Sequence, residues 1–590
     1  MTKPPDNFPS SSPWQFGLRW FLLATAAVAG FMAWWTYQVR DLRQRREATE
    51  KIVQWQNEAI SPDNFWIPDL RELTTPPVAW WLALSGEETY PLLTSLSFDV
   101  RSYDDAFVES SPIDDSHLPT IALATTLKTL KIPRAKITDA GLAALASLQE
   151  LVSLDLEDTP ITDEGLRHLA KLRSLERLNL SGTQVRGSGL AFLADCPLAE
   201  LSLTNTPLES ATLPLKPLTK LRALDISGPK LSEVGIIDHP NLQRVSIYFQ
   251  SPGRVQLERL PQLSTASIHA AELLSFQVQD LSALSDLTLH CDRVASQERR
   301  ECVLQSLEGL KQLKIYGRDQ FALQLMTQLA ELDSLEQLEI YATGQRLGDE
   351  EAQLLSGLSR LRILRIRPSS IANRGLQALP ENLEQLDIET DGATVEGLQP
   401  LARLEQLRML VLTGLRGEQD PGPALGEFKR LEELTLGDVR SRSVTLIAAD
   451  DGPQPTFPSL KQFRISGPSV EKIQVTRLAK LADLNLNLPR ARSFEIRRLP
   501  ALTHLNVSFA QRQQIDEWAF HDLPKLGWLS LQCGDDGHVQ FPEDAFDHLA
   551  AFPKMSGIIC GLDLPPRAAK QLQQYGKAKG LSITLPVPRE

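Results

Sequence analysis

The fold is decided by LVSLDLEDTPITDEGLRHLAKLRS (Leu151–Ser174) and LERLNLSGTQVRGSGLAFLADCP (Leu175–Pro197), two adjacent stretches that repeat one pattern 24 residues apart. Both read LxxLxLxxTx(I/V) and then continue with leucines at helical spacing. The alternating leucines indicate a short strand with one buried face, and the rest of each unit returns the chain to the next strand. A unit of this size cannot bury its apolar face alone, so the pattern predicts a solenoid of stacked units.

The same pattern can be followed through nineteen units by the second leucine, or its apolar substitute, in each. These positions are Leu130, Leu154, Leu178, Leu201, Leu224, Val245, Ala266, Leu287, Leu313, Leu338, Leu364, Leu386, Leu410, Leu434, Phe463, Leu484, Leu505, Leu529 and Ile558. We therefore expect an α/β repeat whose strands form one parallel, concave sheet with a strand spacing of about 4.8 Å. An earlier unit begins at Leu93 and is separated from the others by an irregular insert over 101–120.

The segments between the strands are of two kinds. ITDAGLAALASL (Ile137–Leu148) is predicted to be helical, with Thr138 or Asp139 as the cap. Shorter units instead carry VQLERL, FQVQDL, IQVTRL and FEIRRL, whose alternation predicts a second short strand on the outer face. Threonines such as Thr159, which follow the strand, are expected to bond neighbouring backbone in a ladder.

Composition indicates a folded chain without a nucleic-acid role. Hydrophobic residues make up 42% and charged residues 23% of the 590 positions, which argues against large-scale disorder. The formal net charge of -13 leaves no concentrated basic face for phosphate. The five cysteines show no CxxC pairs, so buried thiols are the default interpretation, with a Cys291–Cys302 disulfide as an open alternative.

An uncharged run, WFLLATAAVAGFMAWWTY, extends from Trp20 to Tyr37. Eighteen residues are at the lower end of what spans a bilayer as a helix. The aromatic residues at its end fit an interfacial belt, and arginines follow from Arg40 onward. We therefore predict a single-pass transmembrane signal anchor over 14–39. A signal peptide cleaved near Ala27–Ala29 is the less favoured alternative, because the apolar run continues beyond that site.

More basic residues follow this segment than precede it, so the positive-inside bias favours a cytoplasmic location for the repeats, while the side of the membrane stays open. The expected organisation is a disordered tail over 1–13, the anchor over 14–39, a juxtamembrane helix and N-terminal cap over 40–92, the solenoid over 93–554, and a last repeat with its C-terminal cap over 555–590.

The repeats over Leu127–Leu148 and Leu151–Leu172 resemble a bacterial family of membrane-anchored leucine-rich-repeat proteins, whose units read LxxLxLxxTxITDxGLxxLxxL. FGLRWFLLATAAVAGFMAWW, followed by RQRREATEKI, is similar to the signal anchor of that family, and PVAWWLALSGEETYPLLTSLSF is similar to its cap. The resemblance implies a leucine-rich-repeat solenoid (horseshoe) preceded by one transmembrane helix. It implies a generic binding role and carries over no catalytic residue, cofactor or defined ligand.

One column of residues singles out a candidate partner-binding surface. The residue after the last apolar position of the strand motif is Tyr248, His269, His290, Tyr316, Tyr341 and Arg367 in six consecutive units. Because these residues lie between buried positions, we expect them to form a ladder on the concave face. Exposed Tyr, His and Arg supply contact area with polar tips and favour an interaction site. Aromatic residues also favour strands for structural reasons alone, so plain stacking is the competing interpretation.

Two further arrangements of side chains are candidate sites beside this ladder. His269 and His290, with Cys291 nearby, could hold a zinc ion, but no further ligand at a suitable spacing is evident, so stacking is favoured and no metal is predicted. His504 and Trp528 share another column in the C-terminal units, where Trp528 could be an anchor or be covered by the C-terminal segment.

These features favour a membrane-tethered scaffold that binds a protein partner through its concave face. The alternative is an extracytoplasmic module that binds the cell envelope or carbohydrate, with tyrosine and tryptophan stacking on sugars. Phosphate-loop, HExxH and GxSxG motifs are absent from the sequence, so we expect a protein that is not an enzyme and needs no cofactor. The identity of the partner and the oligomeric state stay open.

Overall fold

A computed structural model of the chain divides it into two compact units, Met1–Leu231 and Ser232–Glu590, and each is considered by itself. The structure describes residues 13–58, 73–74, 92–98, 111–209, 214–294, 301–318, 321–343, 346–426, 428–448, 457–510, 513–533, 539–542, 544–545, 557–560, 566–579 and 583–584. The predicted tail over 1–13 lies outside these residues except for Pro13, where the first helix begins.

The first unit contains the repeats that match the opening pattern most closely. Its elements are α1 (Pro13–Glu58), β1 (Leu73–Thr74), β2 (Leu92–Leu93), β3 (Ser95–Ser97), α3 (Leu118–Ile121), β4 (Thr129–Lys131), α4 (Asp139–Leu142), η1 (Ala143–Ser147), β5 (Ser153–Asp155), α5 (Asp163–Leu169), β6 (Arg177–Asn179), η2 (Ser188–Asp195), β7 (Glu200–Leu203) and β8 (Ala223–Gly228). Strands β3 to β8 pair in parallel and in sequence order, and the predicted leucines stand opposite one another, as in Leu130 with Leu154. The predicted parallel stacking is confirmed in this unit.

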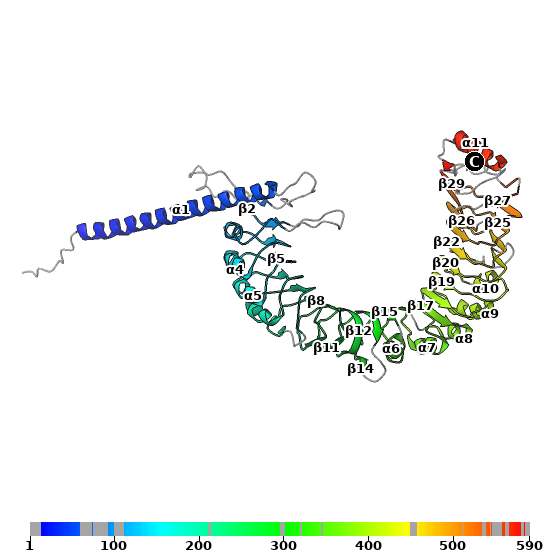
Figure 1. Cartoon of the computed structure of the whole chain (residues 1–590), viewed down its shortest axis with the longest axis horizontal. Helices are drawn as coiled ribbons and strands as arrows, with labels where there is room; N and C mark the ends of the chain where they lie inside the picture. Colours follow the sequence, from blue (N-terminus) through cyan, green and yellow to red (C-terminus); the bar gives the residue numbers. More distant parts are fainter. Residues whose placement is uncertain are drawn as a thin grey trace, which may run out of the picture. The chain divides into compact units, whose positions relative to one another are not determined.

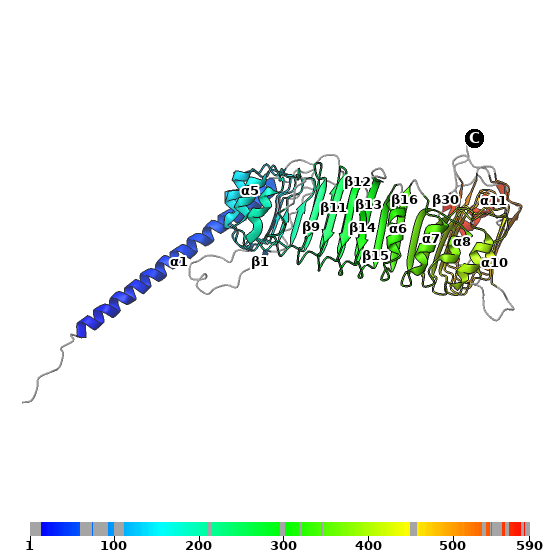
Figure 2. The same cartoon turned by 90° about the horizontal axis from the view of Figure 1, so that it is seen from below.

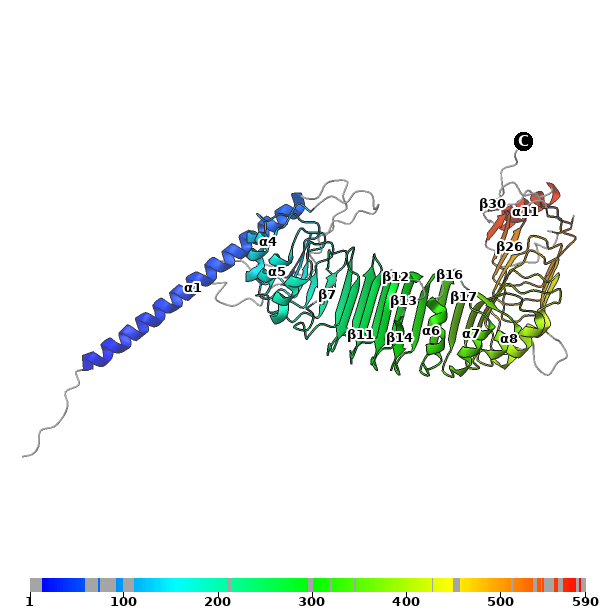
Figure 3. The same cartoon turned by 60° about the horizontal axis from the view of Figure 1, so that its bottom comes forward.

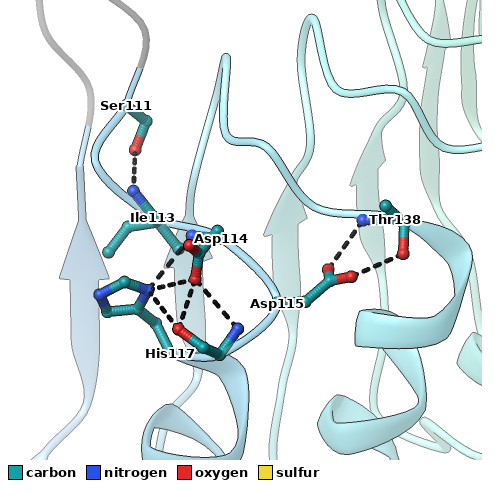
Figure 4. Close-up of polar contacts among 7 residues, drawn as sticks. Ser111, Ile113, Asp114, Asp115, His117 and Thr138 are labelled. Carbon is teal, nitrogen blue, oxygen red and sulfur yellow. Dashed lines mark hydrogen bonds and ion pairs between the residues drawn. The ribbon is translucent and has the colours of Figure 1, made fainter.

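The TDxGL part of the repeat forms a contact between successive units. Thr138 is the N-cap of α4, but the Asp115 carboxylate of the preceding unit accepts from its amide at 2.8 Å and from its hydroxyl at 2.6 Å (Figure 4). Asp139 repeats this arrangement on Thr162, at 2.9 Å and 2.6 Å. A Cβ on Gly165 would lie 2.3 Å from the Asp139 Oδ1 atom, so glycine leaves room for the carboxylate. The motif therefore links each helix start to the unit before it.

The insert predicted over 101–120 is only partly irregular. Its last residues form a bridge between Asp114 and Lys136 and the helix α3, whose Leu118 and Ile121 are fully buried. They take the place of the return segment of the first repeat, because Asp115 supplies the first carboxylate of the series. The prediction of an irregular segment through Thr120 was wrong for this part.

The helix α1 is continuous through the predicted anchor and the basic segment after it (Figure 1). Its C-terminal part packs on the first repeat, where Ala48 and Ile52 are buried. The Trp55 and His117 rings meet there edge to face, with their centroids 4.6 Å apart. The apolar side chains from Leu23 to Tyr37 are largely exposed. Within the part of the chain that the structure describes, no helix meets the length and apolarity needed for a membrane span, so the predicted transmembrane helix over 14–39 is not supported.

The second unit continues the repeats with a different mixture of return segments. Its strands are β9 (Glu233–Ile237), β10 (Arg244–Phe249), β11 (Gly253–Glu258), β12 (Thr265–Gln279), β13 (Asp286–Val294), β14 (Glu301–Gln305), β15 (Gln312–Arg318), β16 (Gln337–Thr343), β17 (Ile363–Ile371), β18 (Gln385–Thr390), β19 (Met409–Thr413), β20 (Glu433–Gly437), β21 (Ser443–Ile447), β22 (Gln462–Ser466), β23 (Lys472–Thr476), β24 (Asp483–Asn487), β25 (Ser493–Arg497), β26 (His504–Phe509), β27 (Glu517–His521), β28 (Trp528–Cys533), β29 (Gly557–Cys560) and β30 (Ile583–Thr584). Its helices are α6 (Phe321–Leu329), α7 (Asp349–Leu354), η4 (Leu355–Gly357), α8 (Asn373–Ala378), α9 (Val395–Leu398), η5 (Gln399–Arg403), α10 (Gly422–Leu425) and α11 (Pro566–Lys579).

A main parallel sheet runs through this unit in the order β10, β12, β13, β15 to β20, β22, β24, β26, β28, β29 and β30. Figure 2 shows the strands from β9 to β16 lying side by side. The apolar positions from Val245 to Ile558 stand in register, and those with described side chains are buried. One face of this sheet is therefore the core, and the residues between the apolar positions form its other side, called the open face below.

The short units carry the second strand that their alternation predicted. β9, β11, β14 and the last part of β12 pair in parallel on the return side, and β21, β23, β25 and β27 do the same further along. The longer units carry helices there instead, and α6, α7 and α8 follow one another along the array (Figure 3). Both predicted kinds of return segment are confirmed.

The prediction for the threonines after the strands needs revision, whereas the prediction of buried thiols is confirmed at Cys196 and Cys291. Each threonine hydroxyl after a strand donates to the carbonyl three residues earlier in its own repeat, at 2.7 Å for Thr159, 2.6 Å for Thr183 and 2.8 Å for Thr206. These side chains are buried and brace their own repeat, and of the three only Thr206 also donates to the next repeat, to the Ser227 carbonyl at 3.5 Å, so the expected bond between repeats is present at one position. Cys291 is a buried thiol, and the side chain of Cys302 lies outside the described residues.

Candidate functional site

The ladder residues that the sequence singled out lie in register on neighbouring strands. The paired positions are Tyr248 with His269, His269 with His290, His290 with Tyr316, Tyr316 with Tyr341, and Tyr341 with Arg367. They come from β10, β12, β13, β15, β16 and β17, so six adjacent strands of the main sheet contribute one residue each. The predicted alignment is present, and the six residues are called the ladder below.

The rings of the ladder stack on one another along the sheet. The ring centroids are 6.0 Å apart for Tyr248 and His269, and 5.4 Å apart for the two histidines. The next steps are 6.0 Å from His290 to Tyr316 and 5.3 Å to Tyr341, where the two planes differ by only 6°. Offset stacking at such distances is favourable for aromatic pairs. Each inner ring therefore has neighbours on both faces, and Tyr248, 52% exposed, ends the stack.

The local sequence explains why these side chains point away from the core. Ile247 and Ile268 precede the first two ladder residues and are fully buried. Successive residues of a strand point to opposite faces, so Tyr248 and His269 lie on the open face. The hydroxyl of Ser267, two residues before His269 on the same face, lies 3.0 Å from its Nε2 atom.

A charged network borders the tyrosine end of the ladder. Arg365 lies 3.0 Å from the Glu339 carboxylate, which is only 5% exposed, and it also donates to Gln385 at 2.9 Å. Arg367 donates from Nε to Asp387 at 2.6 Å. The ladder arginine is thus an ion-pair partner and not a further stacked ring. Its guanidinium is held in place by the carboxylate of the next strand.

Burial shifts the pKa of three ladder rings, His269, Tyr316 and Tyr341, in the direction that favours their neutral forms. Desolvation, followed by the repulsion of His290, lowers the pKa of His269. Burial raises the pKa of both Tyr316 and Tyr341, and the negative charge of Glu339 adds to the effect. Neutral imidazole and phenol groups can both donate and accept hydrogen bonds at their edges. The ladder therefore offers a rigid row of polar edges.

A zinc site at His269 and His290 lacks a further ligand among the described residues. Cys291 follows His290 in β13 and points into the core, where it is fully buried. The two imidazoles are stacked with planes 20° apart. No cluster of three or more potential ligands of the His, Cys, Asp or Glu type occurs among the described residues.

The second column singled out by the sequence is also in register. His504 pairs with Trp528 across β26 and β28, and its Nδ1 lies 3.2 Å from the Asp483 carboxylate on β24. Trp528 is 38% exposed. It makes no ring contact with another described aromatic residue, unlike the ladder rings.

Sequence reasoning missed the charged network beside the ladder. The signal was present in the column two residues earlier, where Lys314, Glu339, Arg365 and Asp387 alternate in sign along four successive strands. Cross-strand pairs of opposite charge are favourable neighbours in a sheet. This column can be found from the sequence, because each of the four residues directly follows a leucine of the repeat register, Leu313, Leu338, Leu364 or Leu386.

The repeat pattern matches two leucine-rich-repeat family models. A model described as a leucine-rich repeat region covers residues 252–512, and a model described as a leucine-rich repeat matches 124–146, 148–170 and 171–194. Together with the register of the leucines, these matches show that the chain is a leucine-rich-repeat solenoid with a long parallel sheet in each unit. No curated protein matches the chain.

Several solved structures share this fold at low identity. An internalin of Listeria monocytogenes is 17% identical, with 60% of this chain and 92% of that chain covered and a TM-score of 0.34. A leucine-rich-repeat protein of Leptospira interrogans is 16% identical, with 75% and 91% covered and a TM-score of 0.38. The Toll–Spätzle complex of Drosophila gives 16% identity, 72% and 57% covered and a TM-score of 0.46.

Proposed function

We propose that the chain is a membrane-tethered scaffold that binds another protein through the ladder. The observation that carries this proposal is the continuous row of rings from Tyr248 to Tyr341 on five adjacent strands. Tyrosine and arginine are enriched among the residues that dominate binding energy in protein interfaces. A preformed row of rings also loses little conformational freedom when a partner binds.

The stacking geometry favours a protein partner over a sugar at the ladder. A pyranose ring stacks on a free aromatic face, whereas the inner faces of the ladder are covered by neighbouring rings. What remains available is the edges, the tyrosine hydroxyls and the adjoining Arg367–Asp387 ion pair. The peptide groups of a protein partner can form hydrogen bonds with the ring edges and the tyrosine hydroxyls, and its charged side chains can pair with Arg367 and Asp387.

The test combines crosslinking with loss of the two most closely stacked tyrosines. A photoreactive phenylalanine analogue at Tyr248, the exposed end of the stack, should capture a partner from cells for identification by mass spectrometry. Tyr316→Ala together with Tyr341→Ala should reduce that capture at least tenfold while leaving the fold intact. The matched control, Asn487→Ala with Ser508→Ala, changes the same column further along β24 and β26 and should retain capture. Equal capture by both double variants would refute the ladder as the binding site.

The membrane tether is a separate part of the proposal. It is supported by the uncharged run from Trp20 to Tyr37, the exposed apolar side chains of α1 and the resemblance of the TDxGL repeats to anchored proteins. The basic residues from Arg40 onward favour a cytoplasmic repeat region. The full chain should remain in the membrane pellet after a carbonate wash, and a chain that begins at Asp41 should not. Protease treatment of sealed vesicles then reports the side on which the repeats lie.

A further inference from the structure

The open face near the C-terminal end of the main sheet differs in chemistry from the ladder. We call it the amide face, and it is formed by β24, β26 and β28. Its exposed and part-exposed residues are Asp483, Asn485, Asn487, His504, Asn506, Ser508, Trp528 and Gln532. Asp483 and His504 are its titratable residues, and the His504 Nδ1 atom lies 3.2 Å from the Asp483 carboxylate and 2.9 Å from the Thr503 hydroxyl. The rest of this face therefore carries amides, hydroxyls and one indole.

The polar side chains of the amide face stand in two rows across the strands. Asn485 pairs with Asn506, and this row ends there, because the next residue, Ser530 on β28, is only 2% exposed. In the other row, Asn487 pairs with Ser508, which pairs with Gln532 on β28. Neighbouring strands lie about 4.8 Å apart, so the rows present donors and acceptors at nearly regular intervals.

These amides are not used by the fold. Asn485, Asn487 and Asn506 make no side-chain hydrogen bond to another described residue, and neither do Ser508 and Gln532. By contrast, Asn179 in the first unit donates to Asp155 at 2.9 Å, and Asn373 in the second unit donates to Thr394 at 2.9 Å. Side-chain amides that are partly exposed and unpaired within the protein are available to a ligand, each with two donors and an acceptor.

Trp528 borders these rows with an accessible ring. Its register neighbours are His504, which is held by Asp483, and Gly557, which has no side chain. Among the described residues, the β29 neighbour thus adds no side chain beside the indole, which is 38% exposed, in contrast to the covered ring faces of the ladder. An indole face of this kind can pack on the C–H face of a sugar ring while adjacent amides bond the hydroxyls.

We propose that the amide face binds a neutral oligosaccharide. Vicinal hydroxyls both donate and accept, which matches the side-chain amides of Asn485, Asn506 and Gln532. A charged ligand would be desolvated against the uncharged centre of this face without gaining an opposite charge. Among the described residues, the charges on and beside this face are the Asp483 carboxylate of β24 and Arg464 of β22, which stands beside Asn485. This inference rests on a different surface from the ladder, so it does not depend on the protein-binding proposal.

The experiment measures binding of neutral hexasaccharides of glucose, mannose and N-acetylglucosamine to the full chain by calorimetry, in a detergent without a sugar headgroup. We expect at least one of them to bind the unmodified protein. Trp528→Ala should weaken that binding about tenfold, which corresponds to about 1.4 kcal/mol. Asn485→Ala with Asn506→Ala should weaken it to a similar extent, and the Tyr316→Ala, Tyr341→Ala ladder variant should bind as the unmodified protein does.

The outcomes are distinct for the two proposals. Loss of sugar binding in both amide-face variants, with retention in the ladder variant, supports the inference even if the ladder captures no protein. The inference is overturned if no hexasaccharide binds, or if the amide-face double variant retains full affinity. It is also overturned if an arrayed peptide library binds and Trp528→Ala abolishes that binding, because the face would then recognise protein. Matching thermal midpoints for all variants establish that the fold is unchanged.

Discussion

Replacing Gly165 by alanine tests how the TDxGL motif joins successive repeats. The added Cβ would lie 2.3 Å from the Asp139 Oδ1 atom and 3.1 Å from its Cγ, so the carboxylate must move. Moving it breaks its bonds to the Thr162 amide and hydroxyl, at 2.9 Å and 2.6 Å. Hydrogen bonds to a charged group contribute about 1.5–3 kcal/mol each when buried, and these are only part-buried. We therefore expect Gly165→Ala to lower the free energy of unfolding by about 2 kcal/mol.

The decisive measurement is a double-mutant cycle with Asp139→Ala. Asp139→Ala alone should cost about 2 kcal/mol, because it removes the same two hydrogen bonds. In that background the clash is gone, and Gly165→Ala should be neutral or stabilise by up to about 1 kcal/mol through helix propensity. Urea unfolding followed by circular dichroism gives the free energies, and amide exchange at Thr162 reports the bond directly. Gly357→Ala is the control, since nothing lies within 4 Å of its added Cβ. An equal loss for Gly165→Ala with and without Asp139 would refute the reasoning.

Three further predictions concern the second unit and the buried threonines. Arg365→Ala leaves the nearly buried Glu339 carboxylate without its cation and should lower the free energy of unfolding by about 2–3 kcal/mol in urea titrations. Arg362 forms an exposed ion pair with Glu384 at 2.6 Å, and Arg362→Ala should lower the free energy of unfolding by less than about 1 kcal/mol. Burial lowers the pKa of His269 below its ordinary value of 6.5, so the unfolded chain binds more protons at this residue than the folded chain does. The stability that comes from the neutral imidazole is therefore present above about pH 6.5 and is lost as the pH falls toward the lowered pKa. His269→Gln should reduce the fall in melting temperature between about pH 7.5 and pH 5.5, and an unchanged pH profile would contradict this explanation. Thr183→Val removes the buried hydroxyl bond to the Leu180 carbonyl and should lower the unfolding free energy by about 1 kcal/mol, while an equally stable variant would show that the bond has no net value.

The sequence predicts the repeats well because their physics is periodic. Each strand needs an apolar residue at Leu154 and its equivalents, and a break in that series would expose the core. The ladder follows from the same register, since Tyr316 and Tyr341 occupy equivalent positions in their motifs. The alternation within VQLERL likewise predicts the second strand, which is β11.

The remaining features depend on contacts between repeats that no single repeat reveals. Asp139 looked like a cap of its own helix, but its carboxylate reaches Thr162 in the next repeat. Thr159 was expected to reach out of its repeat, yet its hydroxyl finds a nearer carbonyl within it. The pairing of Glu339 with Arg365 requires the offset between two units of unequal length.

The hydrogen bonds of the TDxGL carboxylates all run the same way along the first unit, from a donor in one repeat to an aspartate in the repeat before it. The Asp115 carboxylate accepts a hydrogen bond from Thr138, and the Asp139 carboxylate accepts one from Thr162. The Asp163 carboxylate accepts from the amides of Gly187 and Gly189, so each of these donors is bonded to a residue earlier in the chain. Removing the aspartate of one repeat therefore leaves the hydrogen bonds at the start of its own helix intact. Removing the preceding repeat, by contrast, removes the carboxylate that accepts those bonds. Shortening the array from its C-terminal end should be tolerated repeat by repeat, whereas removing the segment that carries Asp115 leaves the next repeat to fray and exposes each successor in turn.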